Sequence, residues 1–274
     1  MSDLDKFKEE ILKDYPRLKP DDRFRFSCHM QVECFNKCCA DVNILLTPYD
    51  VLRMKRRLGL PSGEFLDRYT LLPIGPKQKL PIPILKMDDS EEKRCIFVDM
   101  DKGCTLYEDR PWPCRMYPLG QASPDETSQE REFFFVIKDD ICLGHQSDKE
   151  WTVLGWMDDQ GVAEYNEMGE IFKEITLHPK IQHGDPLEPK KTDMYFMACY
   201  DLDRFRHFVF DTTFLDRFEV DEETKEKLLN DDVELLRFGF RWLKFCLFGE
   251  KTLAVRKEVA DKVLATYSVD QPEN

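Results

Sequence analysis

Cysteines are the residues of this sequence whose type and spacing point most directly to chemistry. Eight of the ten cysteines lie within the 115 residues that begin at Cys28. They fall into three groups: Cys28, Cys34, Cys38 and Cys39, then Cys95, Cys104 and Cys114, and finally Cys142. A free cysteine packs as a small hydrophobe and gains nothing from neighbours of its own kind. The clustering therefore predicts a shared task for these eight thiols.

The start of the chain indicates the compartment in which the thiols work. The segment MSDLDKFKEEILKDYPRL is charged from its third residue, unlike a signal peptide, and no run approaches the roughly 18 apolar residues of a membrane span. We therefore expect a cytoplasmic protein without a membrane span. Because disulfides rarely persist in a reducing cytosol, the clustered thiols favour metal ligation or redox chemistry over structural bridges.

Net charge narrows the choice of partners. The formal charge is −14 and the pI is near 4.9, whereas nucleic acids and anionic lipids attract basic surfaces. We therefore expect no nucleic-acid partner and predict a protein partner, either a redox partner or a larger complex.

The adjacent pair Cys38 and Cys39 bears on the number of metal centres. Consecutive side chains of an extended segment point in opposite directions, so these two thiols need not face one centre. Two separate sites, or one cluster with a spare thiol beside it, both fit the sequence.

The second group of cysteines is expected on a hairpin and a proline-stiffened loop. The segments LPIPILKM and RCIFVD read as strands, and the turn DKG places Cys95 before and Cys104 after a hairpin turn. Three prolines surround Cys114, which predicts that its sulfur is held outside any helix or central strand. Arg110 and Arg115 flank it, and their charge would offset that of thiolate ligands.

The remaining elements predict an α+β fold. We expect a small, irregular strand-and-loop metal domain over residues 1–145, packed with a mainly helical region over residues 146–274. One helix is predicted to have Thr47 as its N-cap, Pro48 as its first residue and Gly59 as the residue that ends it. We also expect a short helix over residues 4–13, buried strands over 44–46 and 133–137, a polar surface loop over 121–130 and a final helix over 257–268. The basic run MKRR (residues 54–57) reads as a solvated helix face, and Cys199 and Cys246 read as packing thiols outside the cluster.

Two blocks of the sequence resemble a known family. The first cysteine group is similar to a CxxCxxCC block. The second group, with its Arg-Pro, Cys-Arg and Tyr-Pro pairs at Arg110, Cys114 and Tyr117, is similar to the second block of the YkgJ-type cysteine-cluster proteins. The resemblance covers roughly residues 24–145. It implies a zinc- or iron-chelating domain, often associated with iron–sulfur oxidoreductases, and flagellin lysine N-methylases carry a similar domain.

The chain departs from the family pattern in its first block, where C-x5-C-x3-CC replaces C-x2-C-x2-CC. This places the role of Cys28 in question, because the longer loop can carry it away from a shared centre. His29 and His145 lie near cysteines and are alternative ligands. We leave both out of the predicted ligand set, because eight thiols suffice for two four-coordinate sites.

Three functions remain open. The first is one or two iron–sulfur clusters, [4Fe–4S] in preference to other types, with a redox or electron-transfer role. The second is structural zinc in an interaction or assembly module. The third, ranked lowest, is a transferase related to the lysine N-methylases. Soft thiolates suit both metals, and the irregular spacing differs from the paired knuckles of zinc ribbons, which favours iron–sulfur.

Overall fold

The computed structural model describes residues 16–73, 79–122 and 133–261. The predicted helix over 4–13 and nearly all of the predicted loop over 121–130 lie outside this range, as does most of the predicted helix over 257–268. The described chain combines helices with small antiparallel sheets, which confirms the α+β class. It divides into two compact units, one of Met1–Leu45 with Leu85–Asn166 and one of Leu46–Ile84 with Glu167–Asn274. The predicted boundary after residue 145 stays a prediction.

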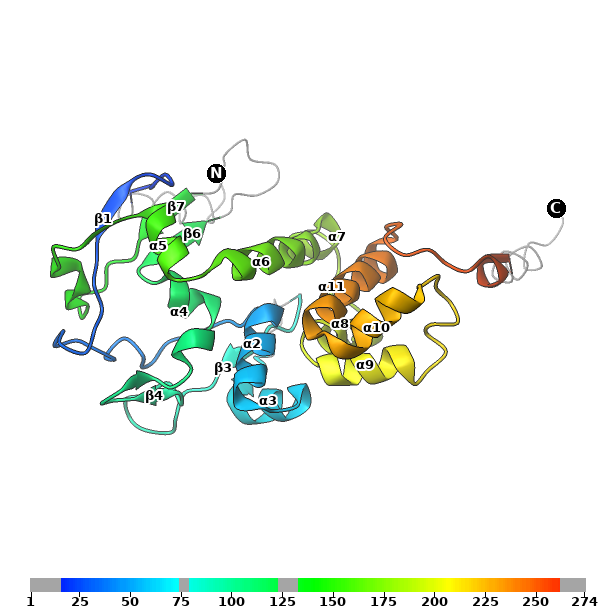
Figure 1. Cartoon of the computed structure of the whole chain (residues 1–274), viewed down its shortest axis with the longest axis horizontal. Helices are drawn as coiled ribbons and strands as arrows, with labels where there is room; N and C mark the ends of the chain where they lie inside the picture. The colour runs from blue at the N-terminus through cyan, green and yellow to red at the C-terminus, as the bar shows by residue number, and fades with distance from the viewer. Residues whose placement is uncertain (1–15, 74–78, 123–132, 262–274) are drawn as a thin grey trace. The chain divides into compact units, whose positions relative to one another are not determined.

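Short strands, each paired with a single neighbour, characterise the first unit (Figure 1). The antiparallel pairs are β1 (Arg23–Arg25) with β8 (Glu150–Thr152), β4 (Val98–Asp99) with β5 (Gly103–Cys104), and β6 (Leu119–Ala122) with β7 (Phe133–Val136). Two further strands, β2 (Thr70–Leu71) and β3 (Ile84–Leu85), form another small sheet. The short helices of the first unit are η1 (Tyr107–Asp109), α4 (Trp112–Met116), η2 (Leu143–Gln146) and α5 (Val153–Asp159).

The core of the first unit is small and aromatic. Phe24 and Phe26 are buried while the arginines between and beside them are exposed, as the alternation of a half-buried strand requires. Both rings meet Trp156 edge-on, at centroid distances of 6.1 and 5.5 Å. The cluster is completed by Met116, Leu119, Val153 and Val162. This core lies directly beside the chain that carries Cys28.

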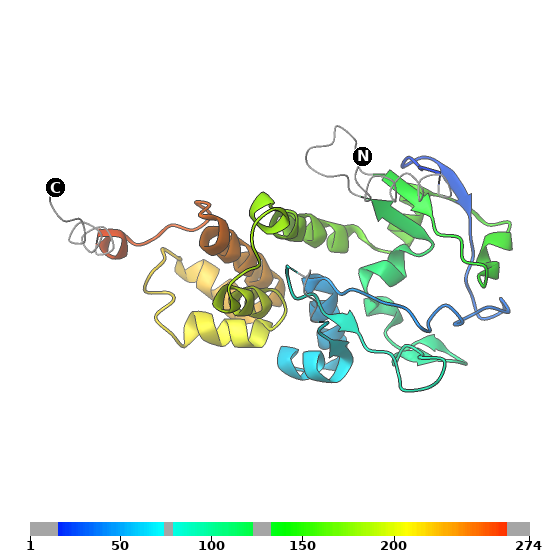
Figure 2. The ribbon, with the colours of Figure 1, turned by 180° about the vertical axis from the view of Figure 1, so that it is seen from behind.

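Helices make up most of the second unit (Figure 2). They are α2 (Pro48–Leu58), α3 (Ser62–Tyr69), α7 (Pro179–Gln182), α8 (Pro189–Cys199), α9 (Leu202–Phe210), α10 (Glu222–Asn230), α11 (Asp232–Leu243) and the π-helical turn η3 (Lys244–Phe248). Helix α6 (Ala163–Thr176) begins in the first unit and belongs to the second from Glu167 onward. Large buried aromatic rings, including Tyr195, Phe205 and Phe240, fill the interior.

Helix α2 forms as its sequence predicts. Thr47 accepts a hydrogen bond from the Asp50 backbone N–H, Asp50 accepts one from the Thr47 backbone N–H, and Pro48 opens the helix. Gly59 ends it at a φ of 66°. The prediction that residues 54–57 form a solvated helix face is wrong at Lys55. This side chain is 5% exposed and forms ion pairs with Asp203 and Asp232.

Three further local predictions are corrected by the structure. Cys114 lies inside helix α4, because Pro113 occupies the first turn, where its missing N–H costs nothing. Strand β7 is half-buried rather than buried on both faces. In the segment 44–46, Leu45 is 51% exposed between two buried neighbours, and Ile44 and Leu46 bond to residues 83–85 without forming a full strand.

Candidate metal centre

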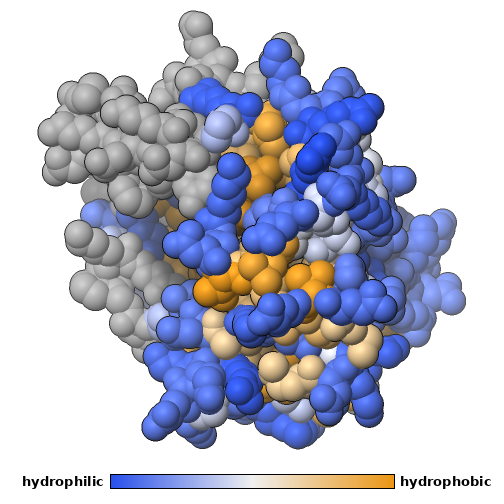
Figure 3. Space-filling view, turned by 90° about the vertical axis from the view of Figure 1, so that its left-hand side faces the viewer, coloured by the Kyte–Doolittle hydropathy of each residue, from blue (hydrophilic) through white to orange (hydrophobic). Residues whose placement is uncertain are grey.

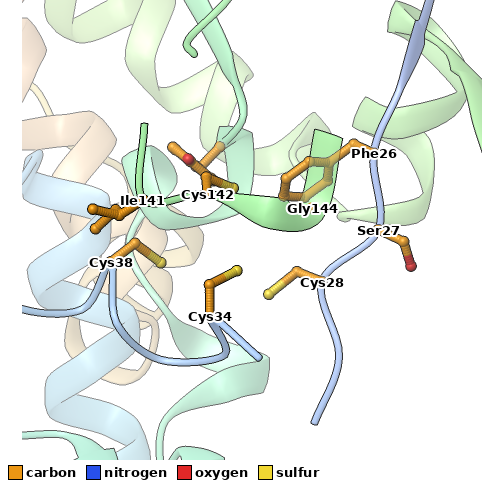
Figure 4. A pocket seen from close by; sticks show the side chains of 9 residues that line it. Phe26, Ser27, Cys28, Cys34, Cys38, Ile141, Cys142 and Gly144 are labelled. Atoms are coloured by element: carbon orange, nitrogen blue, oxygen red, sulfur yellow. The ribbon is translucent and has the colours of Figure 1, made fainter. Parts of the chain in front are cut away.

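Four of the predicted thiols line one small cavity in the first unit. These four, here called the pocket set, are Cys28, Cys34, Cys38 and Cys142. Figure 4 shows them facing a common space, together with Phe26 and Ile141. The cavity measures about 10 Å³, close to the space that one water molecule needs. The fold therefore brings together thiols that lie 114 positions apart in the sequence.

Two backbone contacts hold the pocket set together. The Ser27 N–H donates to the Gly144 carbonyl at 3.0 Å, and the Leu143 N–H donates to the Cys34 sulfur at 3.2 Å. A Cβ added at Gly144 would lie 2.7 Å from the Phe26 ring and 2.9 Å from the Ser27 carbonyl oxygen. Only glycine permits this close approach, which fixes the segment of Cys142 against the segment of Cys28.

The other four thiols come from three segments: Cys39 from the first group, Cys95 and Cys104 from either side of the β4–β5 turn, and Cys114 from helix α4. These four, here called the hairpin set, are Cys39, Cys95, Cys104 and Cys114. The Cys95 N–H donates to the Cys39 carbonyl at 2.7 Å, and Cys104 pairs with Val98 across the hairpin. The predicted hairpin, with one cysteine on each side of its turn, is therefore confirmed.

Electrostatic coupling links the members of the hairpin set. Burial, followed by the nearby Cys104, raises the pKa of Cys95. The pKa of Cys39 is raised by a hydrogen bond to Cys38, by burial and by the charges of Cys38, Cys114 and Cys95. These electrostatic effects connect Cys104 with Cys95, and Cys39 with both Cys95 and Cys114.

The two sets meet at the adjacent residues Cys38 and Cys39. The Cys39 thiol donates to the Cys38 sulfur, which lowers the pKa of Cys38 to about 7. In the pocket set, burial raises the pKa of the Cys28 thiol to about 11, and the charges of Cys38, Cys34 and Cys142 add to it. Residue Cys28 as a whole is exposed, but its sulfur points into the cavity (Figure 4).

The gathered thiols are not yet a finished coordination sphere. Across residues 16–73, 79–122 and 133–261, no group of three or more His, Cys, Asp or Glu side chains is arranged so that it could hold a metal ion. Metal binding therefore requires the thiols to turn toward a common point and to lose their protons, which couples binding to pH.

Two buried arginines supply positive charge beside the hairpin set. Arg110 and Arg115 are each 7% exposed. Arg115 donates to the carbonyls of Arg110, at 3.0 Å, and Gln160, at 2.6 Å. Burial raises the pKa of Cys104, and the Arg110 charge opposes that rise. Carbonyl oxygens satisfy these guanidinium donors but leave their positive charge unneutralised, and this arrangement suits an anionic centre made of thiolates.

Two buried polar atoms lie near the pocket set. Among the described residues, His145 Nε2 has no hydrogen-bond partner, whereas the Tyr117 hydroxyl lines the cavity beside Cys142, and burial followed by this contact with Cys142 raises the pKa of Tyr117. The His145 ring packs on Phe26 at 5.3 Å, whereas His29 is exposed and its Nδ1 accepts from the Gln31 N–H at 3.3 Å. Tyr117 was not among the predicted site residues, although its place in the Tyr-Pro pair after Cys114 was a signal that could have identified it.

The donor set fits a thiophilic metal. Thiolate sulfur binds zinc and iron–sulfur clusters, and both accept four cysteine ligands. The buried guanidinium groups and the Tyr117 hydroxyl beside Cys142 provide the charge and the hydrogen-bond donor that such a centre uses. The fold and the site therefore define a cysteine-rich metal-chelating domain.

Comparison with known families agrees with this class. Residues 27–143 match the CxxCxxCC family model, described as "Putative zinc- or iron-chelating domain". The match begins one residue before Cys28 and ends one residue after Cys142, so it contains all eight thiols. This segment is similar to that family, which confirms the resemblance inferred from the sequence. No curated protein and no solved structure matches the chain significantly.

The helices were also compared with the requirements of a membrane span. Among the described residues, none of the helices combines the length and the apolar character that crossing a bilayer demands.

Proposed function

We propose that the eight thiols hold two neighbouring [4Fe–4S] clusters and that the protein transfers electrons to a protein partner in the cytoplasm. The observation that carries this proposal is that Cys28, Cys34, Cys38 and Cys142 line one cavity, which leaves the four thiols of the hairpin set for a second cluster. Four cysteines per cluster is the usual ligation of a [4Fe–4S] centre. Each set therefore supplies one complete complement of ligands.

The contact between Cys38 and Cys39 supports a redox role. Adjacent residues in different sets would place two centres side by side, which suits passage of an electron from one to the other. The Leu143 N–H on the Cys34 sulfur is a contact of the kind that adjusts cluster potentials. When bound, the clusters would supply one-electron chemistry, while the chain supplies the thiolates, the buried arginines and the surrounding apolar walls.

The metal and acid-labile sulfide content of protein purified without oxygen tests this proposal. We expect iron and sulfide in equal amounts, sufficient for two clusters, and a broad visible band that bleaches on reduction. Colourless protein with zinc alone would contradict it. Cys246→Ser is the matched control, because Cys246 lies in η3, outside both sets, and its loss should leave the spectrum unchanged.

One observation favours a second candidate, structural zinc. The cavity of about 10 Å³ has room for an occupant about the size of a water molecule, so a four-iron core would have to push the thiols outward. In this alternative two zinc ions staple the irregular first unit, and the helical second unit binds a partner. Two equivalents of zinc, no sulfide and no colour would establish it. The transferase alternative stays a prediction.

A further inference from the structure

The four members of the pocket set are not equivalent. Cys34 is 8% exposed and accepts the Leu143 N–H, and Cys38 and Cys142 are half-buried. Cys28 is exposed, as are His29 and Met30 after it, and the Met30 side chain is 65% exposed. Cys28 is therefore the member of the set whose residue reaches solvent, although its sulfur points into the cavity with the other three.

Backbone hydrogen bonds separate Cys28 from the rest of the set. Turns closed by Phe35, Lys37 and Cys39 hold the segment that carries Cys34 and Cys38. Cys28 lies six positions before Cys34 and enters the cavity from another side (Figure 4). Its neighbour Ser27 is fixed to Gly144, but that bond involves the backbone alone. The Cys28 side chain can therefore rotate out without disturbing the contacts that position the other three thiols.

We propose that Cys34, Cys38 and Cys142 hold the metal of the pocket set permanently and that Cys28 is a displaceable fourth ligand, which gives up its place to a small thiol from solution. This inference rests on the proposed function. The exchange is balanced without a redox step: the incoming thiol forms a sulfur–metal bond, and its proton passes to the departing Cys28 thiolate.

The residues around the cavity of the pocket set favour a neutral incoming ligand. Ile141 lines the cavity and is 49% exposed, so an incoming molecule meets an apolar wall. The Asp139 side chain, which accepts the Ile141 N–H at 3.2 Å, places a carboxylate on the same loop and disfavours anions. On the face that Figure 3 shows, hydrophobic residues are interspersed with hydrophilic ones. A small uncharged thiol with an apolar body therefore suits the position better than an anionic one.

Alkylation of the metal-loaded wild-type protein tests the inference without a variant. Iodoacetamide is added without oxygen, and mass spectrometry follows each cysteine while metal content is measured in parallel. With the metal bound, we expect Cys28 to react faster than Cys34, Cys38 or Cys142 and the metal to be retained, because Cys28 is the exposed residue of the set and the one from which the metal can be reached. Equal protection of Cys28 and Cys34, or loss of the pocket metal as Cys28 reacts, would overturn the inference.

A pair of variants adds an independent readout. We expect Cys28→Ser to retain the full metal content and to shift its visible spectrum on addition of 2-mercaptoethanol, whereas Cys34→Ser loses the metal of one centre. Equal metal loss in both variants would refute the displaceable role of Cys28. If the wild-type protein holds too little metal for two centres, the proposed function is refuted instead. Failure of the inference about Cys28 and failure of the proposed function are therefore distinguishable.

Discussion

The two compact units contrast in what holds them together. The second unit has helices with large buried rings, such as Phe205 stacked on Trp242 at 5.4 Å. The first unit has short strand pairs, a small aromatic cluster and all eight clustered thiols. A unit with little regular structure and a small core gains much of its stability from metal ligands, whereas one with a large apolar core needs none. The comparison predicts that metal matters to the first unit and not to the second.

Metal removal should have the largest effect. Replacing Cys104 with Ser, or stripping the metal with a chelator, should unfold the region around the hairpin set, because bound metal contributes on the order of 10 kcal/mol to such sites. Hydrogen exchange followed by mass spectrometry should report lost protection over residues 95–114 and unchanged protection over residues 195–243. Equal loss in both regions would show that the units do not differ in this way.

Truncation of the aromatic core should produce the converse result. Phe205→Ala removes a fully buried ring and should lower the free energy of unfolding of the second unit by about 3–5 kcal/mol. Urea denaturation, with metal content measured alongside, provides the check. Metal loss from this variant would contradict the independence of the two units.

Acid should weaken the second unit through Asp232. Burial raises the pKa of this carboxyl, but the Arg206 hydrogen bond and the Lys55 charge outweigh that effect and lower it to about 2. Because the folded-state pKa is depressed, the stabilisation is complete above the ordinary carboxyl pKa and is lost as the pH falls from about 5 toward 2. We expect a loss of about 1–2 kcal/mol in this window.

Unfolding of the Asp232→Asn variant as a function of pH provides the control for this carboxyl. Asparagine cannot titrate, so the variant should be less stable near neutral pH and should show a shallower decline below pH 5. If the stability of the variant declines with acid as steeply as that of the wild type, Asp232 is not the group that causes the decline.

The helix cap at Thr47 should have a smaller effect. Thr47→Ala removes the side-chain oxygen that accepts the Asp50 N–H and should cost about 1 kcal/mol, lowering the unfolding midpoint of the second unit. Thr47→Ser keeps the acceptor and is the matched control. If Thr47→Ser loses as much stability as Thr47→Ala, the capping hydrogen bond is not the source of the loss.

The smallest effect is expected at Cys246. Burial raises the pKa of this thiol to about 11, so it is protonated and poorly reactive near neutral pH. Cys246→Ser should therefore change neither metal content nor the visible spectrum. Metal loss in this variant would extend the site beyond the eight clustered thiols.

Features governed by neighbours in the sequence were predicted well. The capped start of α2 at Thr47, its end at Gly59 and the hairpin between Cys95 and Cys104 depend on a few consecutive residues. Cys199 is fully buried in an apolar run, as expected. Cys114 is the instructive error, since prolines that suggested an irregular loop instead begin a short helix.

The sequence by itself predicted which residues carry the chemistry, because eight thiols within 115 positions are hard to explain by packing. It also determined the local helices and the hairpin, whose signals are short in range. Tertiary structure decided the rest: which thiols share a cavity, why Lys55 is buried between two aspartates, and where the Tyr117 hydroxyl lies. These features depend on contacts between segments far apart in the chain, such as Ser27 with Gly144, and no spacing within one segment encodes them.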